Sequence, residues 1–190
     1  IAVNAIAGSG KSHCSEATIR AYKPKTGFYT AFNKAIVEDS RKRFGNLLES
    51  KTIHAIAYKY IKPTKAIEDL NYSTIKERIS YDDKAIIIDT LDDFFRSNSI
   101  DVAEYVTNRI GDEYLQHLVV DYANMMLEGK IPPTFNYMLK CLHIMLEHKE
   151  VEIDVDLLIF DEGQDVVAVT LEIFKLINAN QKLILGDKYQ

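Results

Sequence analysis

The sequence predicts an α/β fold in which helices flank a parallel sheet and an all-helical insertion interrupts it. Strand-like apolar runs alternate with helix-like runs at both ends of the 190-residue chain. That alternation is typical of parallel strands joined by crossover helices. From about residue 63 to about residue 150, apolar residues instead recur at helical spacing, without strand-like alternation.

The first section predicts a strand, a helix, a second strand and a second helix, at residues 1–5, 11–22, 27–31 and 33–44. In the middle section we expect helices over residues 82–95, 115–126 and 134–147, with their aromatic and methionine side chains in a core. Gly129 followed by Pro132 and Pro133 ends the second of these helices.

The last section returns to the strand–helix pattern. Residues 157–160 form a continuous apolar run, as expected of a strand buried on both faces, and are followed by a helix at 167–177 and a strand at 182–185. We therefore expect residues 1–62 and 151–190 to form one sheet domain, and residues 63–150 to be inserted into it. Since no closing element precedes Gln190, we expect that domain to be incomplete in this chain.

The composition, 47% hydrophobic and 27% charged with a net charge of −5, is that of an ordinary soluble protein. We expect no membrane span, since no apolar run reaches the roughly 20 residues required. Two cysteines and the lack of a leader favour a reducing, intracellular location without disulfides or a structural metal. That location would be the cytoplasm of a bacterium or phage-infected cell, or a eukaryotic nucleus.

The charge is divided unevenly. Residues 1–65 contain 12 Lys and Arg against 4 Asp and Glu, a charge of +8, so the rest of the chain carries −13. The basic section predicts either a solvated surface or a face that attracts nucleic acid.

A glycine-containing turn follows the first strand and opens the first helix, as in a Walker A loop. Its glycines allow backbone N–H groups to point at phosphate oxygens. Lys11 would reach the β and γ phosphates and Ser12 would hold Mg²⁺. Ala5 stands where the pattern has its first glycine, and the structural alternative is a glycine-rich connection with a surface lysine. The expected ATP-binding residues are Ala7, Gly8, Ser9, Gly10, Lys11 and Ser12.

An acidic pair follows the buried strand at 157–160. Asp161 fits the role of organising Mg²⁺, and Glu162 could orient and deprotonate the attacking water. A solvated acidic loop would explain the charges but not their position directly after four apolar residues. Together the two motifs predict a Mg²⁺-dependent nucleoside triphosphatase.

Five blocks, in order, resemble the ATPase domain of superfamily 1 helicases of the UvrD type. The Ala-Phe-Asn-Lys-Ala form of the second block, together with Met138-Leu139-Lys140, is most similar to the F-box DNA helicases and their phage and bacterial relatives. The most specific blocks are the Asp-Glu-x-Gln-Asp and Gly-Asp-x-x-Gln pair. The blocks are residues 7–12, 30–35, 52–58, 161–165 and 186–190.

The resemblance implies a P-loop NTPase fold of the RecA type and 3′→5′ movement on single-stranded DNA. It implies that Gln190 senses the γ-phosphate, beside Lys11 and Glu162 in the catalytic set. It also implies partners: single-stranded DNA, junctions of single- and double-stranded DNA, and a second RecA-like domain outside this chain. The implied DNA-contacting residues are Phe32, Asn33, Lys34, Thr52 and His54.

Two residues depart from the family pattern. Gly163 replaces the usual alanine, and Asn136 stands where the nearest relatives tend to have aspartate. The adenine-reading motif expected upstream of the Walker A loop is not in this sequence. The leading hypothesis is therefore the motor domain of a DNA helicase or translocase. The alternatives are a P-loop ATPase that does not act on nucleic acid, and a non-catalytic nucleotide-binding or interaction module.

Overall fold

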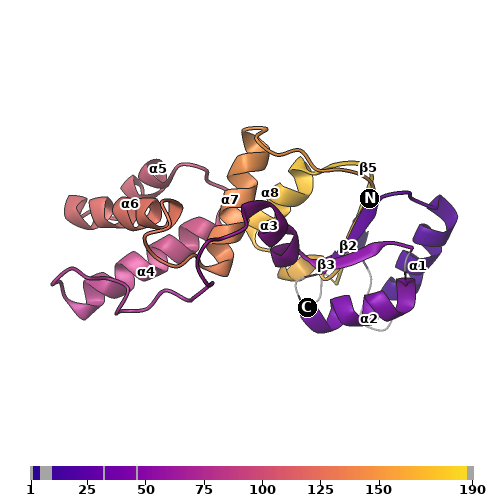
Figure 1. Cartoon of the computed structure of the whole chain (residues 1–190), viewed down its shortest axis with the longest axis horizontal. Coiled ribbons are helices and arrows are strands. Elements are labelled where there is room, and N and C mark those ends of the chain that lie inside the picture. The colour runs from indigo at the N-terminus through magenta and orange to yellow at the C-terminus, as the bar shows by residue number, and fades with distance from the viewer. Residues whose placement is uncertain (1, 5–9, 32, 46, 188–190) are drawn as a thin grey trace.

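The computed structural model describes residues 2–4, 10–31, 33–45 and 47–187. Its strands are β1 (Ala2–Asn4), β2 (Gly27–Ala31), β3 (Glu49–Thr52), β4 (Asp154–Phe160) and β5 (Asn178–Gly186). They form one sheet in the order β1-β5-β4-β2-β3, and every neighbouring pair is parallel (Figure 1). The predicted parallel α/β sheet is confirmed.

Helices cover both faces of this sheet. They are α1 (Lys11–Tyr22) and α2 (Lys34–Phe44) on one face, and α3 (Ile53–Ile61), α7 (Phe135–Glu147) and α8 (Ala168–Leu176) on the other. Leu157 and Ile159 of β4 pack with the first pair of helices, whereas Leu158 and Phe160 pack with the second group. The continuous apolar run at 157–160 therefore serves two cores, because successive strand side chains point to opposite faces.

The remaining helices form a separate lobe, at the left of Figure 1. They are α4 (Tyr81–Arg96), α5 (Val102–Thr107) and α6 (Glu113–Leu127), and their apolar faces meet in a core of their own. Helix α7 contributes Tyr137 to the core of the lobe and Met138 and Leu139 to the core beside the sheet. The division at residues 62/63 and 150/151 stays a prediction. No described helix has the length and apolar composition needed to cross a bilayer.

Strand β3 and helices α3 and α5 were not predicted. Strand β3 consists of Glu-Ser-Lys-Thr and lies at the edge of the sheet, so it has no apolar alternation to reveal it. Helix α5 has only 6 residues, too few for a helical period to be read from the sequence. The other predicted elements are all present, with ends shifted by a few residues.

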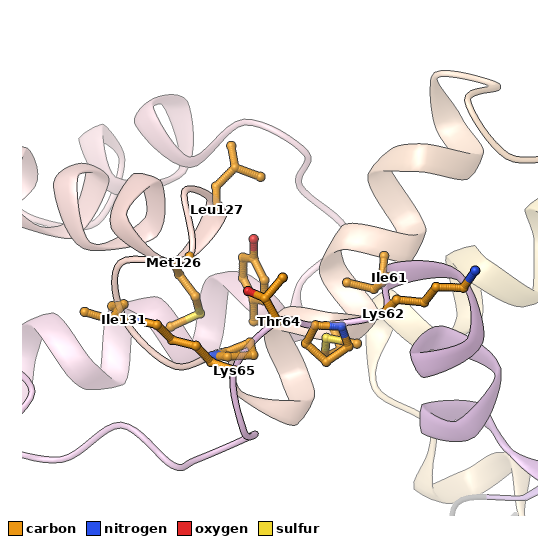
Figure 2. A pocket seen from close by; sticks show the side chains of 12 residues that line it. Ile61, Lys62, Thr64, Lys65, Met126, Leu127 and Ile131 are labelled. Carbon is orange, nitrogen blue, oxygen red and sulfur yellow. The ribbon is translucent and has the colours of Figure 1, made fainter.

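The segment that leaves α3 is tied to the connection between α6 and α7. Lys65 Nζ donates to the carbonyl of Lys130 at 2.7 Å, and the amide of Glu68 donates to the carbonyl of Pro133 at 3.1 Å. A cavity of about 170 Å³ lies between this segment and the connection from α6 to α7. Ile61 and Met126 are among the side chains that line it from opposite sides (Figure 2). The described lining of this cavity contains none of the predicted site residues.

Lys140 is a buried cation that joins α7 to the end of α4. Its Nζ donates to the carbonyls of Ser97, at 2.9 Å, and Ser99, at 2.5 Å, and lies 4.6 Å from the ring centroid of Phe94. Ser97 is the C-cap of α4, so the lysine satisfies backbone carbonyls where that helix ends. Burial lowers the pKa of Lys140 to about 8.

Lys140→Met should reduce the increase in the free energy of unfolding that the wild type shows between about pH 8 and pH 10. In the wild type the folded lysine releases its proton near pH 8, while the unfolded lysine keeps its proton up to the ordinary lysine pKa of 10.5. The unfolded chain then binds more protons, so the free energy of unfolding rises with pH in this window. Relative to the variant, the wild type should gain on the order of 1–3 kcal/mol. Urea unfolding at both pH values measures this gain, and parallel curves for the two proteins would contradict it.

Candidate active site

The predicted site residues that the structure describes lie at the carboxyl end of the sheet. Because all five strands are parallel, their carboxyl ends share this edge, and α1, α2 and α3 each begin there. Described residues of four sequence blocks therefore lie here, after β1, β2, β3 and β4. The fifth block begins at Gly186, where β5 ends. The predicted residues Ala7, Gly8, Ser9, Phe32 and Gln190 lie outside the described residues.

Gly10 begins helix α1. Its backbone has φ 90°, a left-handed conformation that glycine adopts without strain, and it serves as the N-cap without a side-chain hydrogen bond. Ser12, in the first turn, is half-buried. The positive end of this helix therefore faces the carboxyl edge of the sheet, as an anion site requires.

Lys11 and Glu162 form an ion pair although 151 residues separate them. Lys11 Nζ lies 3.2 Å from Glu162 Oε2, and the two side chains are 11% and 24% exposed. The structure thus brings together the cation of the glycine-containing turn and the second carboxylate of the acidic motif.

Asp161 is buried at the end of β4, and both of its carboxylate oxygens accept hydrogen bonds. Oδ1 accepts from the amide of Glu162 at 2.9 Å, and Oδ2 accepts from the hydroxyl of Tyr29. The amide of Asp161 donates to the carbonyl of Thr30 at 2.8 Å. The carboxylate is thus held in one orientation by the two strands that meet beside it.

Tyr29 is one of the residues of this site that the sequence analysis missed. It is buried in β2 and packs edge-on against Phe44 of α2, with 4.9 Å between the ring centroids. Burial, and then the hydrogen bond to Asp161, raise the pKa of the Tyr29 hydroxyl, so it remains a donor. The sequence carries no signal for this role, because it depends on the register that pairs Tyr29 with Ile159, two residues before Asp161.

Glu162 and Gly163 form a tight turn directly after β4. Glu162 has φ 56° and ψ 49°, a left-handed conformation that costs about 1–3 kcal/mol for a residue other than glycine. A 3₁₀ turn follows at Gly163–Asp165. A Cβ at Gly163 would lie 2.6 Å from Ile184 Cγ2, so the glycine that departs from the family pattern fits the space beside β5.

The described residues expected to contact DNA follow the neighbouring strand ends. Ala31 and Thr52 are paired in register, so α2 and α3 begin side by side. Asn33 and Thr52 are the N-caps of these helices: Asn33 Oδ1 accepts from the amide of Ala35 at 2.8 Å, and Thr52 Oγ1 from the amide of Ala55 at 3.1 Å. Lys34 is exposed in the first turn of α2.

His54 packs against the start of helix α7. Its ring is perpendicular to that of Phe135, with 5.4 Å between the centroids, and burial lowers the pKa of His54. Phe135 is 52% exposed and was not predicted as a site residue. The signal available in the sequence was an aromatic residue directly after the capping Thr134. Asn136, the second departure from the family pattern, donates to Asp92 Oδ1 at 2.7 Å and so joins α7 to α4.

Comparison of the chain with protein-family models gives no match, and comparison with curated proteins gives none that is significant. The described residues contain no group of three or more His, Cys, Asp and Glu side chains placed to hold a metal ion. The structure describes both residues that the sequence analysis expects to hold Mg²⁺, Ser12 and Asp161.

Tyr29→Phe should lower the free energy of unfolding by about 1–3 kcal/mol, because the buried carboxylate of Asp161 loses a donor. The ring and its contact with Phe44 remain, so the substitution tests the hydroxyl alone. Urea unfolding at neutral pH measures the loss. The control is Tyr22→Phe, which removes a hydroxyl from a tyrosine that is 40% exposed. Equal losses for the two variants would contradict the role of the Tyr29 hydroxyl.

Proposed function

We propose that this chain contains the ATP-binding and ATP-hydrolysing motor domain of a DNA helicase or translocase that acts on single-stranded DNA. The observation that carries the proposal is the 3.2 Å contact between Lys11 Nζ and Glu162 Oε2, beside the buried Asp161. A lysine at the start of a helix and a carboxylate pair after a buried strand are the groups that a P-loop NTPase brings to one phosphate.

In this proposal each described side chain has one task. Lys11 neutralises the β and γ phosphates, and Ser12 and Asp161 are the residues that would hold Mg²⁺. Bound Mg²⁺ would supply neutralisation of the phosphate charge. Of the residues outside the described ranges, Ala7, Gly8 and Ser9 would cradle the phosphates with Gly10, and Gln190 would sense the γ-phosphate.

The proposed reaction is an attack of water on the γ-phosphate. The water oxygen forms a bond to the γ-phosphorus while the bond from this phosphorus to the bridging oxygen breaks. The electron pair of that bond leaves with ADP, and Glu162 accepts the proton of the water. For this step Lys11 must exchange Glu162 for phosphate, because the ion pair otherwise holds the carboxylate.

The proposed path for single-stranded DNA follows the first turns of α2 and α3. Its supports are the exposed Lys34, the half-exposed Phe135 and the side-by-side starts of the two helices. Asn33 and Thr52 keep a second role as caps, so their contribution to binding would be partly the orientation of helix N–H groups toward phosphates. Polarity of 3′→5′, action at junctions and a second RecA-like domain are part of the proposal because the family resemblance implies them. The proposal also includes a cytoplasmic location, or a nuclear one in a eukaryote.

Glu162→Gln should retain binding of ATP and lose turnover by a factor of about 10²–10⁴, the usual contribution of a general base. The amide still hydrogen-bonds but cannot accept the proton. Nucleotide titration and phosphate release, with and without single-stranded DNA, measure the two effects. The control is Glu152→Gln, an exposed residue outside the site.

Equal loss of binding and turnover would give Glu162 a structural role. Turnover indifferent to DNA would favour an ATPase that does not act on nucleic acid. Binding of nucleotide without turnover even in the full-length protein would favour a non-catalytic module.

Lys34→Ala and Phe135→Ala should weaken single-stranded DNA binding in different ways. Loss of the Lys34 charge should reduce the slope of log K against log salt by about 0.7, the value for one phosphate contact. Loss of the Phe135 ring should reduce affinity by roughly 5–150-fold, equivalent to 1–3 kcal/mol for one stacked base, without a change of slope. Oligonucleotide titrations at several salt concentrations separate the two effects. The controls are Lys175→Ala and Tyr114→Ala, an exposed cation and an exposed aromatic residue on other helices. Losses as large in the controls would rule out the proposed path.

A further inference from the structure

The amide of Gln164 contacts two parts of the site at once. Its Nε2 lies 2.5 Å from Glu162 Oε2, and its Oε1 accepts from the backbone amide of Asp187 at 3.0 Å. A backbone N–H can only donate, so it fixes Oε1 on its own side and directs the Nε2 donor at Glu162. The contact network thus determines the orientation of the side-chain amide.

The turn that carries Gln164 is seated tightly on the end of β5. A Cβ built on Gly163 would lie 2.6 Å from Ile184 Cγ2 and 3.2 Å from the carbonyl oxygen of Leu185. A Cβ built on Gly186 would lie 3.1 Å from Gln164 Oε1 and 3.3 Å from its backbone nitrogen. With so little free space on either side, a shift of the end of β5 must move the Gln164 amide with it.

The same oxygen of Glu162 also holds Lys11. Glu162 Oε2 accepts from Lys11 Nζ at 3.2 Å and from Gln164 Nε2 at 2.5 Å. When a phosphate takes Lys11, as the proposed function requires, Gln164 keeps its contact with that oxygen. The orientation of the carboxylate then depends on Gln164, and through it on the backbone of Asp187.

We propose that Gln164 is a positioning residue that holds the carboxylate of Glu162 and links it to the backbone of Asp187, directly after β5. This inference deepens the proposed function and rests on it for the link to hydrolysis. A shift of the Asp187 backbone moves the donor relative to Glu162. Turnover thereby becomes sensitive to the position of this backbone, without any change in the affinity for nucleotide.

Two substitutions separate the two contacts of the amide. Gln164→Glu keeps an oxygen for the amide of Asp187 and replaces the donor with a second carboxylate oxygen. Gln164→Met has nearly the same shape and removes both contacts. Gln181→Met, the same substitution at an exposed position of β5, is the matched control.

The first measurement is hydrogen exchange of the Asp187 amide in the nucleotide-free protein, which requires no turnover. Gln164→Met should speed this exchange by about tenfold or more, since the acceptor is lost, whereas Gln164→Glu and the control should not. The amide of Ile159, in the central strand β4, reports on general unfolding and should stay protected in all variants. Unchanged exchange of Asp187 in Gln164→Met would overturn the link to the end of β5.

The second measurement is DNA-stimulated hydrolysis. Both Gln164 variants should lower kcat roughly 10–100-fold, the scale seen when the outer partner of a functional side chain is removed, with ATP affinity within about twofold of the wild type. The kcat of Gln164→Glu relative to the wild type should recover as the pH falls, because a protonated carboxyl again donates while its other oxygen accepts. A merely structural role predicts no such recovery, and its absence would overturn the positioning of Glu162.

A wild type without turnover would contradict the proposed function and the link to hydrolysis. The exchange of the Asp187 amide would still decide whether Gln164 holds the end of β5.

Discussion

The parallel direction of all five strands is the constraint on which the site depends. A parallel sheet places the carboxyl ends of all its strands on the same side, so segments remote in sequence come together there. The pair of Lys11 and Glu162 is the clearest result, since these residues follow β1 and β4, which are not neighbours in the sheet. Strand β5 separates them and ends beneath the turn that carries Glu162 and Gln164.

The two carboxylates of the acidic motif are held in opposite ways. Asp161 is buried, with both oxygens occupied by donors from Tyr29 and the adjacent amide, and has one defined orientation. Glu162 is partly exposed, adopts a left-handed backbone conformation, and is held by the side chains of Lys11 and Gln164. A fixed carboxylate suits a group that must keep its place throughout a reaction cycle. A carboxylate held by exchangeable side chains, on a strained backbone, suits a group that must change partners.

The sequence predicted the sheet and most of the helices because burial leaves a visible period in an amphipathic element. Strand β3 was missed for the opposite reason: its four polar residues lie at the sheet edge, where pairing alone defines the strand. Within the site, the sequence analysis singled out Lys11, Asp161 and Glu162 because their residue types bear chemistry. It missed Tyr29 because a buried tyrosine in a strand is ordinarily core, and only tertiary structure brings its hydroxyl to a carboxylate 132 residues away. The role of Lys140 was likewise not predicted. The family resemblance singled out this residue, but no periodicity indicates that it caps another helix.

Helix α7 connects the remaining parts of the molecule. Its first residue, Phe135, contacts His54 of α3, and Lys140 in its middle holds the end of α4. Between them, Met138 and Leu139 pack in the core beside the sheet. A 13-residue helix held at these points moves as one body. A displacement of the lobe therefore either breaks its contacts with α7 or moves α7, and Phe135 with it, against the core beside the sheet, and close-packed interiors resist both. The lobe and the aromatic pair at the carboxyl edge are for this reason one mechanical unit, although 81 residues separate the two rings in sequence.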